Sequence, residues 1–128
     1  MSKEITFGPY GFPKQGEIYK VYFSKKGQEI GKIRPSLIIS NDIQNKYDEQ
    51  IIVAPLTSEE KELITERPFT VSIFKDKTNN LDKDSKILLH RVQTIDASLR
   101  LRDYIGYSSP TIVQESLDAL KVVFAMED

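Results

Sequence analysis

The chain has 128 residues, enough for one domain with its own hydrophobic core, and 39% of them are hydrophobic while 29% are charged. This composition excludes disorder over most of the chain, and the formal net charge of −1 excludes a protein that grips nucleic acid by bulk positive charge. There is no cysteine and only one histidine, which excludes disulfides, thiolate nucleophiles, and cysteine-ligated or multi-histidine metal sites within one chain.

The N-terminal residues indicate neither a targeting signal nor a membrane segment. Residues 1–15 include two glycines and two prolines and lack the apolar core of a signal peptide, so we expect an irregular N-terminal arm there. Elsewhere no apolar run approaches the roughly 18–20 residues of a membrane span. We therefore expect a single cytoplasmic domain over residues 1–128.

After this arm the chain is dominated by short runs typical of β-strands. Residues 17–23 are rich in β-branched and aromatic side chains, and residues 35–40 form an apolar run closed by the turn-forming pair Asn41 and Asp42. Between them, the polar, glycine-bearing residues 24–33 are expected to be a loop. Further strands are predicted over residues 50–54, 69–74, 85–92 and 104–107, with a turn at residues 79–84.

Only the C-terminal segment has the spacing of a helix. Ser109 suits the N-cap and Pro110 the first helical position, where its missing N–H costs nothing. One apolar face is expected to carry Ile112, Val113, Leu117, Leu120 and Phe124. Several strands with one late helix predict a mostly β fold, a small antiparallel barrel or sandwich closed by a C-terminal helix.

Two strand ends carry residues suited to bind a phosphodiester. Arg34 lies at the head of one strand and Thr57 at the end of the next, so a guanidinium and a hydroxyl converge if these ends are neighbours. Residues 1–36 carry seven basic and three acidic side chains, which fits a local anionic site. The alternatives are a surface arginine with solvated loop charges and a threonine that caps the following segment.

His90 is a candidate for acid–base catalysis, although a half-buried, hydrogen-bonded histidine fits the same pattern. Aromatic residues at strand spacing, namely Tyr19, Tyr22, Phe23 and Phe69, could stack on bases, but such residues more often belong to a core. From the residues by themselves, the sequence predicts a small β-barrel with an anion site.

In the identity of their residues, four motifs resemble those of the MazF/PemK family of endoribonuclease toxins from toxin–antitoxin systems. They lie at residues 16–19, 31–42, 52–58 and 94–96, in the order and at the spacing of that family, and the resemblance covers residues 14–125. It implies an SH3-like antiparallel barrel of the MazF/CcdB type that forms a homodimer. It also implies metal-independent cleavage of single-stranded RNA, without a cofactor, that leaves 2′,3′-cyclic phosphate and 5′-hydroxyl ends.

By the same resemblance, the catalytic pair of the family matches Arg34 and Thr57, and the partner that neutralises the toxin is an antitoxin with an acidic C-terminal segment. The implied RNA-binding residues are Gln28, Glu29, Lys32, Ser58, His90, Arg91 and Gln93.

One stretch departs from the family pattern. Many relatives have an acidic residue where this chain has His90, and the glutamine and arginine that follow have changed places in Arg91 and Gln93. Base preference and the proton-transfer group therefore stay open. The alternative function is that of a non-catalytic toxin of the same fold, which inhibits a protein target such as DNA gyrase.

Overall fold

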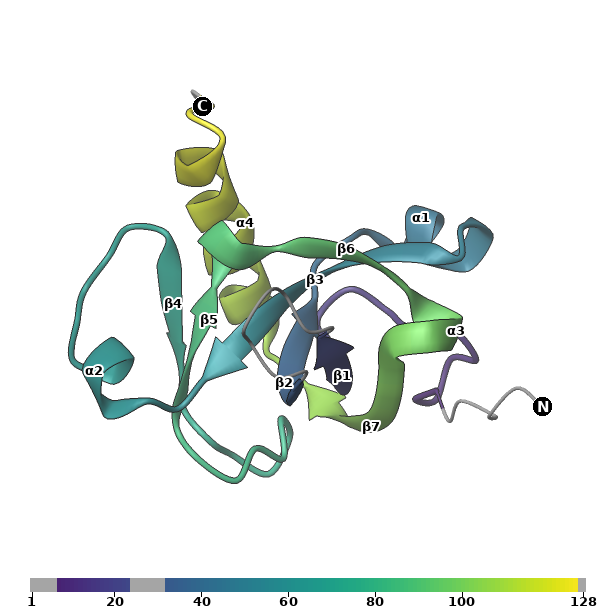
Figure 1. The fold of residues 1–128 in the computed structure, drawn as a ribbon, viewed down its shortest axis with the longest axis horizontal. Helices are drawn as coiled ribbons and strands as arrows, with labels where there is room; N and C mark the ends of the chain where they lie inside the picture. The colour runs from purple at the N-terminus through teal and green to yellow at the C-terminus, as the bar shows by residue number, and fades with distance from the viewer. Residues whose placement is uncertain (1–6, 24–31, 127–128) are drawn as a thin grey trace.

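The computed structural model describes residues 7–23 and 32–126, and its strands form one antiparallel sheet with a helix at the C-terminus (Figure 1). The strands are β1 (Glu17–Phe23), β2 (Lys32–Ile38), β3 (Gln50–Thr57), β4 (Thr70–Ile73), β5 (Ser85–Leu88), β6 (Gln93–Asp96) and β7 (Leu101–Tyr107). The helices are α1 (Asp42–Tyr47), α2 (Glu60–Leu63), α3 (Ala97–Arg100), α4 (Pro110–Val123) and the 3₁₀ turn η1 (Leu89–Arg91).

The order of the strands is β4-β5-β3-β2-β1-β7, and β6 pairs with β3 beside β5. Every pairing is antiparallel. Within the described residues no pairing joins β4 to β7, so the sheet is curled but not closed. The prediction of a mostly β fold with a C-terminal helix is confirmed.

Both faces of the sheet are buried, which explains why its strands look like apolar runs. In β1, Ile18 belongs to one hydrophobic cluster and Tyr19 and Val21 to another, because successive side chains of a strand point to opposite faces. The first cluster includes Leu37 and Leu56 and packs against residues of α4, whereas the second includes Ile95 of β6 and Leu101 of β7.

Helix α4 begins as predicted: Ser109 is its N-cap, and the Ser109 Oγ accepts a hydrogen bond of 3.3 Å from the Ile112 N–H. The predicted apolar face is wrong at its end, because Phe124 lies beyond the helix and is 62% exposed. Ser116 and Ala119 are the buried residues of α4, since small side chains let the helix approach the sheet closely.

Two predicted boundaries are wrong, one because of a local helix cap and one because of strand pairing. The pair at Asn41 and Asp42 starts a helix rather than a simple turn, because the Asn41 side chain accepts a hydrogen bond of 2.9 Å from the Gln44 N–H and caps α1. The strand expected at residues 85–92 is split by η1. Its first half pairs with the end of β3 and its continuation, β6, pairs with the start of β3.

Helix α3, which was not predicted, is capped by Asp96 and precedes a β7 that is longer than expected. Within the described ranges, no helix is long and apolar enough to cross a membrane.

Candidate active site

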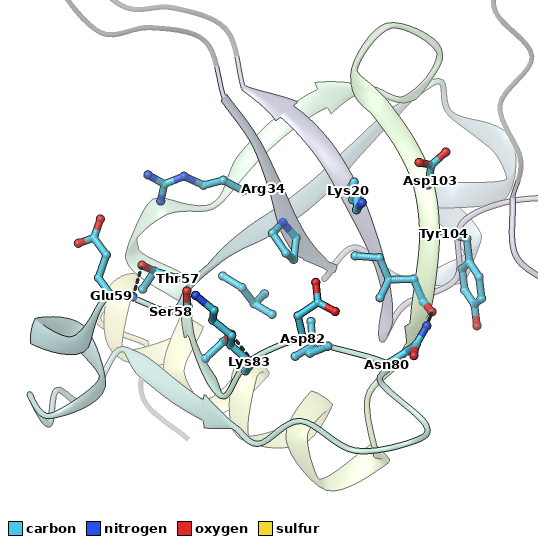
Figure 2. A pocket seen from close by; sticks show the side chains of 15 residues that line it. Lys20, Arg34, Thr57, Ser58, Glu59, Asn80, Asp82, Lys83, Asp103 and Tyr104 are labelled. Atoms are coloured by element: carbon cyan, nitrogen blue, oxygen red, sulfur yellow. Dashed lines mark hydrogen bonds between the residues drawn. The ribbon is translucent and has the colours of Figure 1, made fainter.

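A groove of about 550 Å³ opens beside the start of β2 and the end of β3 (Figure 2). Its walls come from β1, the start of β2, the end of β3, the segment before β5, and β7. Its polar lining consists of Lys20, Arg34, Thr57, Ser58, Glu59, Asn80, Asp82, Lys83, Ser85, Asp103 and Tyr104.

The register of β2 and β3 places Arg34 and Thr57 opposite each other. Ser36 pairs with Pro55, so continuing the antiparallel register by two residues brings Arg34 beside Thr57. Opposed residues of an antiparallel pair present their side chains on the same face. Figure 2 shows the guanidinium of Arg34 on the same side of the groove as Thr57. The two strand ends are therefore neighbours, which is the condition under which the guanidinium and the hydroxyl converge.

Arg34 is half-buried, and no described residue forms an ion pair with it. Its backbone pairs with Val21 of β1, which fixes the base of the side chain. Within residues 7–23 and 32–126, no carboxylate lies within ion-pair distance of the guanidinium. A guanidinium that is half-buried and unpaired in a groove is suited to bind an anionic oxygen.

Thr57 is buried, and its hydroxyl already makes one contact. The Glu59 N–H donates a hydrogen bond of 3.2 Å to the Thr57 Oγ1, so the residue does cap the following turn. A hydroxyl accepts through its lone pairs and still has one O–H to donate. The capping role therefore leaves a donor for a ligand in the groove, and Ser58 beside it is exposed at the rim.

The comparisons identify relatives of this chain. The family model of PemK-like, MazF-like toxins of type II toxin–antitoxin systems matches residues 14–124. The chain belongs to this toxin family. It is 37% identical over 110 residues to endoribonuclease MazF of Staphylococcus saprophyticus subsp. saprophyticus, which covers 85% of this chain and 88% of the relative.

Solved structures share the fold of this toxin. One is an endoribonuclease in complex with its cognate antitoxin from a Mycobacterial species, with a TM-score of 0.71, 20% identity and coverage of 91% of this chain and 98% of that chain. Another is MazF from Deinococcus radiodurans, with a TM-score of 0.70, 20% identity and coverage of 90% and 98%. The expected MazF-type fold is thereby confirmed.

Of the other predicted RNA-binding residues, those that the structure describes do not line this groove. Gln28 and Glu29 lie outside the described residues. Lys32 is exposed at the start of β2. His90 and Arg91 lie in η1, and Gln93 begins β6. Both elements follow the end of β5, whereas Thr57 pairs with Lys86 near its start. None of these described residues lines the groove, and their contact with RNA stays a prediction.

His90 packs against an aromatic ring instead of facing Arg34. Its ring meets Phe69 edge to face, with centroids 4.5 Å apart, and its Nδ1 is buried without a hydrogen-bond partner in the described part of the chain. Burial lowers the pKa of His90, and the positive charges of Arg91 and Arg67 lower it further. The neutral form of the imidazole is thus favoured. His90 is not among the residues that line the groove.

The groove contains residues that sequence reasoning missed because a loop supplies them. Asn79, which is 2% exposed, donates from Nδ2 to the Phe74 carbonyl at 2.8 Å and accepts from the N–H groups of Asp76 and Leu81 at 3.0 Å. This buried asparagine folds residues 74–84 so that Asn80, Asp82 and Lys83 form a wall of the groove. The sequence signals only a turn there.

The charges in the groove are balanced, with the cations of Lys20, Arg34 and Lys83 and the carboxylates of Glu59, Asp82 and Asp103. Among residues 7–23 and 32–126, no group of three or more histidine, aspartate or glutamate side chains is arranged to hold a metal ion.

Proposed function

We propose that this toxin is a sequence-specific endoribonuclease that cuts single-stranded RNA in the groove of Arg34 and Thr57. The observation that carries the proposal is the pair itself: an arginine without an ion-pair partner in the described chain and a threonine hydroxyl, at neighbouring strand ends. The endoribonuclease name of the relative from Staphylococcus saprophyticus supports the same activity.

In the proposed reaction RNA supplies its own nucleophile. The 2′-oxygen forms a bond to the adjacent phosphorus and the bond from phosphorus to the 5′-oxygen breaks, which leaves a 2′,3′-cyclic phosphate and a 5′-hydroxyl. The protein must orient the 2′-hydroxyl and stabilise the charge that develops on the phosphorane. Arg34 would bind its anionic oxygens, while the O–H of Thr57 would donate to a non-bridging oxygen.

The balanced charge of the groove favours a short single strand over a long duplex. A protein that follows a phosphate backbone needs a stripe of cations, whereas single-stranded RNA is recognised by stacking and by hydrogen bonds to base edges. Asn80, Asp82 and Asp103 supply donors and acceptors of that kind at the groove.

We further propose that the toxin acts in the cytoplasm as a homodimer and is neutralised by a cognate antitoxin. The acidic C-terminal segment of that antitoxin would place carboxylates on the groove cations, in the positions of RNA phosphates. The Mycobacterial structural neighbour is in complex with its cognate antitoxin, which supports an antitoxin partner here.

We expect purified toxin to cut a long mixed-sequence RNA at one short sequence and to do so in excess EDTA. The reason is that Arg34 and the 2′-hydroxyl together supply the charge stabilisation and the nucleophile that a metal ion provides in other nucleases. Mapping of the new 5′ ends measures cleavage and base preference together, and a phosphatase-resistant 3′ end reports the cyclic phosphate.

Two results would contradict this proposal. Loss of cleavage in EDTA with recovery on adding magnesium would refute metal independence. If folded protein cut no RNA but bound a protein target such as DNA gyrase, the alternative of a non-catalytic toxin would be favoured.

A further inference from the structure

A buried lysine lies beside Thr57 in the sheet, although it does not line the groove. Lys86 is 3% exposed, and its backbone pairs with that of Thr57 across β5 and β3. Opposed residues of an antiparallel pair present their side chains on the same face. Arg34 lies beside Thr57 on the other neighbouring strand, so Thr57 has a cationic residue on each side of it.

The contacts of Lys86 are few for a buried ammonium, which costs stability unless its N–H groups find acceptors. The Lys86 Nζ donates to the Thr65 carbonyl at 3.4 Å and lies 3.7 Å from a carboxylate oxygen of Glu66. The Glu66 side chain is 90% exposed, so this ion pair adds little stability. One neutral acceptor and one solvated carboxylate do not offset the loss of water around an ammonium, and we expect Lys86 to lower the stability of the fold.

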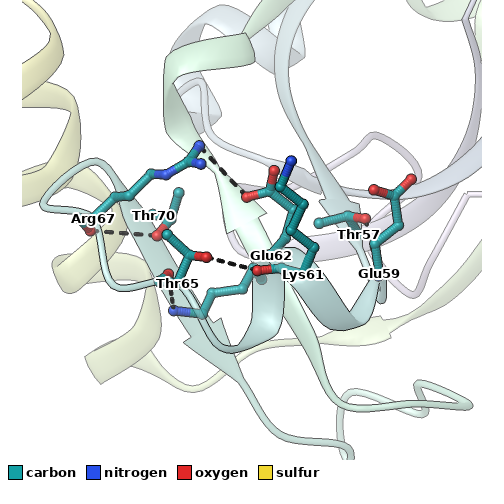
Figure 3. Close-up of polar contacts among 8 residues, drawn as sticks. Thr57, Glu59, Lys61, Glu62, Thr65, Arg67 and Thr70 are labelled. Carbon is teal, nitrogen blue, oxygen red and sulfur yellow. Dashed lines mark hydrogen bonds and ion pairs between the residues drawn. The ribbon is translucent and has the colours of Figure 1, made fainter.

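The Thr65 carbonyl belongs to the segment that leaves the sheet at Thr57 and returns to it at β4 (Figure 3). At its start, the Glu59 N–H donates to the Thr57 Oγ1 at 3.2 Å. After α2, the Thr65 Oγ1 donates to the Lys61 carbonyl at 2.7 Å. The contacts thus run from the Thr57 hydroxyl through α2 to Thr65. Lys86 connects them back to the strand that pairs with Thr57, which closes a ring of contacts around the hydroxyl.

The far end of this segment is held separately. Glu62 and Arg67 form an ion pair of 3.6 Å, and the Thr70 Oγ1 donates to the Arg67 carbonyl at 3.3 Å (Figure 3). Lys86, by contrast, ties Thr65 to β5. Removing the Lys86 ammonium should therefore leave the segment folded and loosen only its connection to the strand beside Thr57.

We propose that Lys86 is a positioning residue for the Thr57 hydroxyl, an inference that rests on the proposed function. Lys86 touches neither the RNA nor the reacting atoms. It fixes the segment whose first N–H binds the Thr57 Oγ1, so that the O–H is aimed at a non-bridging oxygen before RNA binds. The stability lost by burying its charge is the cost of this fixed geometry.

The test compares stability and cleavage in Lys86→Met, Thr57→Ala and the double variant. Lys61→Met is the matched control, because Lys61 is an exposed lysine of the same segment and does not line the groove. Three quantities are measured for each protein. They are the melting temperature, the single-turnover rate at saturating RNA, and the Kd for an RNA made uncleavable by a 2′-deoxynucleotide at the mapped position.

We expect Lys86→Met to melt at the wild-type temperature or above it, because methionine has a similar length and needs no acceptor. Its cleavage rate should nevertheless fall about tenfold with an unchanged Kd, since a misplaced hydroxyl affects the transition state more than binding. In the Thr57→Ala background the same replacement should cost no further rate, because the group through which it acts is gone. Lys61→Met should match wild type in all three measurements.

Cleavage by Lys86→Met at the wild-type rate would overturn the proposal. A melting temperature well below that of wild type would overturn it too, because Lys86 would then be a structural residue of the fold. So would a loss of rate that adds in full to that of Thr57→Ala, since Lys86 would act independently of the hydroxyl. These results leave the proposed function intact, whereas wild-type protein that cuts no RNA refutes the proposed function and the positioning role with it.

Discussion

Replacing Arg34 with alanine should lower the single-turnover rate of RNA cleavage by a few hundredfold while the protein stays folded. The guanidinium is half-buried in the groove and has no ion pair in the described chain, so its charge is available to the transition state. Removing one preorganised group that stabilises an oxyanion costs about 3–4 kcal/mol of transition-state binding. Arg34→Lys should restore little, because an ammonium cannot present two parallel donors to two phosphate oxygens.

The control for this prediction is Arg100→Ala, which removes a guanidinium from α3, outside the groove. It should leave the cleavage rate unchanged. Thermal melts of both variants establish that each is folded. Folded Arg34→Ala protein that cuts at nearly the wild-type rate would remove Arg34 from the site and would leave a solvated surface arginine as the better interpretation.

Replacing Gly106 with alanine should destabilise the fold and distort the groove. A Cβ at Gly106 would lie 2.5 Å from the Thr78 carbonyl oxygen and 2.7 Å from that of Asn79, and both are backbone atoms. The loop cannot simply retreat, because the Tyr107 N–H donates to the Thr78 carbonyl at 3.2 Å. We expect a loss of about 2–3 kcal/mol in the free energy of unfolding, typical of a forced overlap in a packed site.

Urea unfolding measures this loss, and Lys77→Ala is its control, because Lys77 is an exposed residue of the same loop and should change stability by less than about 0.5 kcal/mol. Since the loop also supplies Asn80, Asp82 and Lys83 to the groove, Gly106→Ala should bind RNA more weakly even where it is folded. Wild-type stability in this variant would mean that the loop and β7 are not in tight contact.

Much of the fold could be predicted because its local signals agree with its tertiary contacts. Burial on both faces gives β3 its continuous apolar run, and Ser109 with Pro110 signals the start of α4 independently of the rest of the chain. The split between β5 and β6 could not be predicted. It depends on where each half pairs along β3, and local propensity carries no information about that register.

The candidate site could be predicted only where strand ends supply its residues. Arg34 and Thr57 are marked by their motifs, and their proximity follows from an ordinary antiparallel register. The opposite wall of the groove was not predictable, since Asn80, Asp82 and Lys83 reach it through a loop folded around the buried Asn79. Sequence reasoning also gave His90 a possible role in proton transfer, whereas the structure packs it on Phe69 away from the groove.

The most direct test of the central proposal is cleavage of a short RNA that contains a single 2′-deoxynucleotide on the 5′ side of the mapped scissile bond. If the 2′-oxygen is the nucleophile, this substrate should bind as tightly as the all-ribose RNA and remain uncut under conditions that cleave the all-ribose RNA completely. Cleavage of the deoxy-substituted strand at the same bond would contradict the proposed mechanism, because water or a protein group would then have to be the nucleophile.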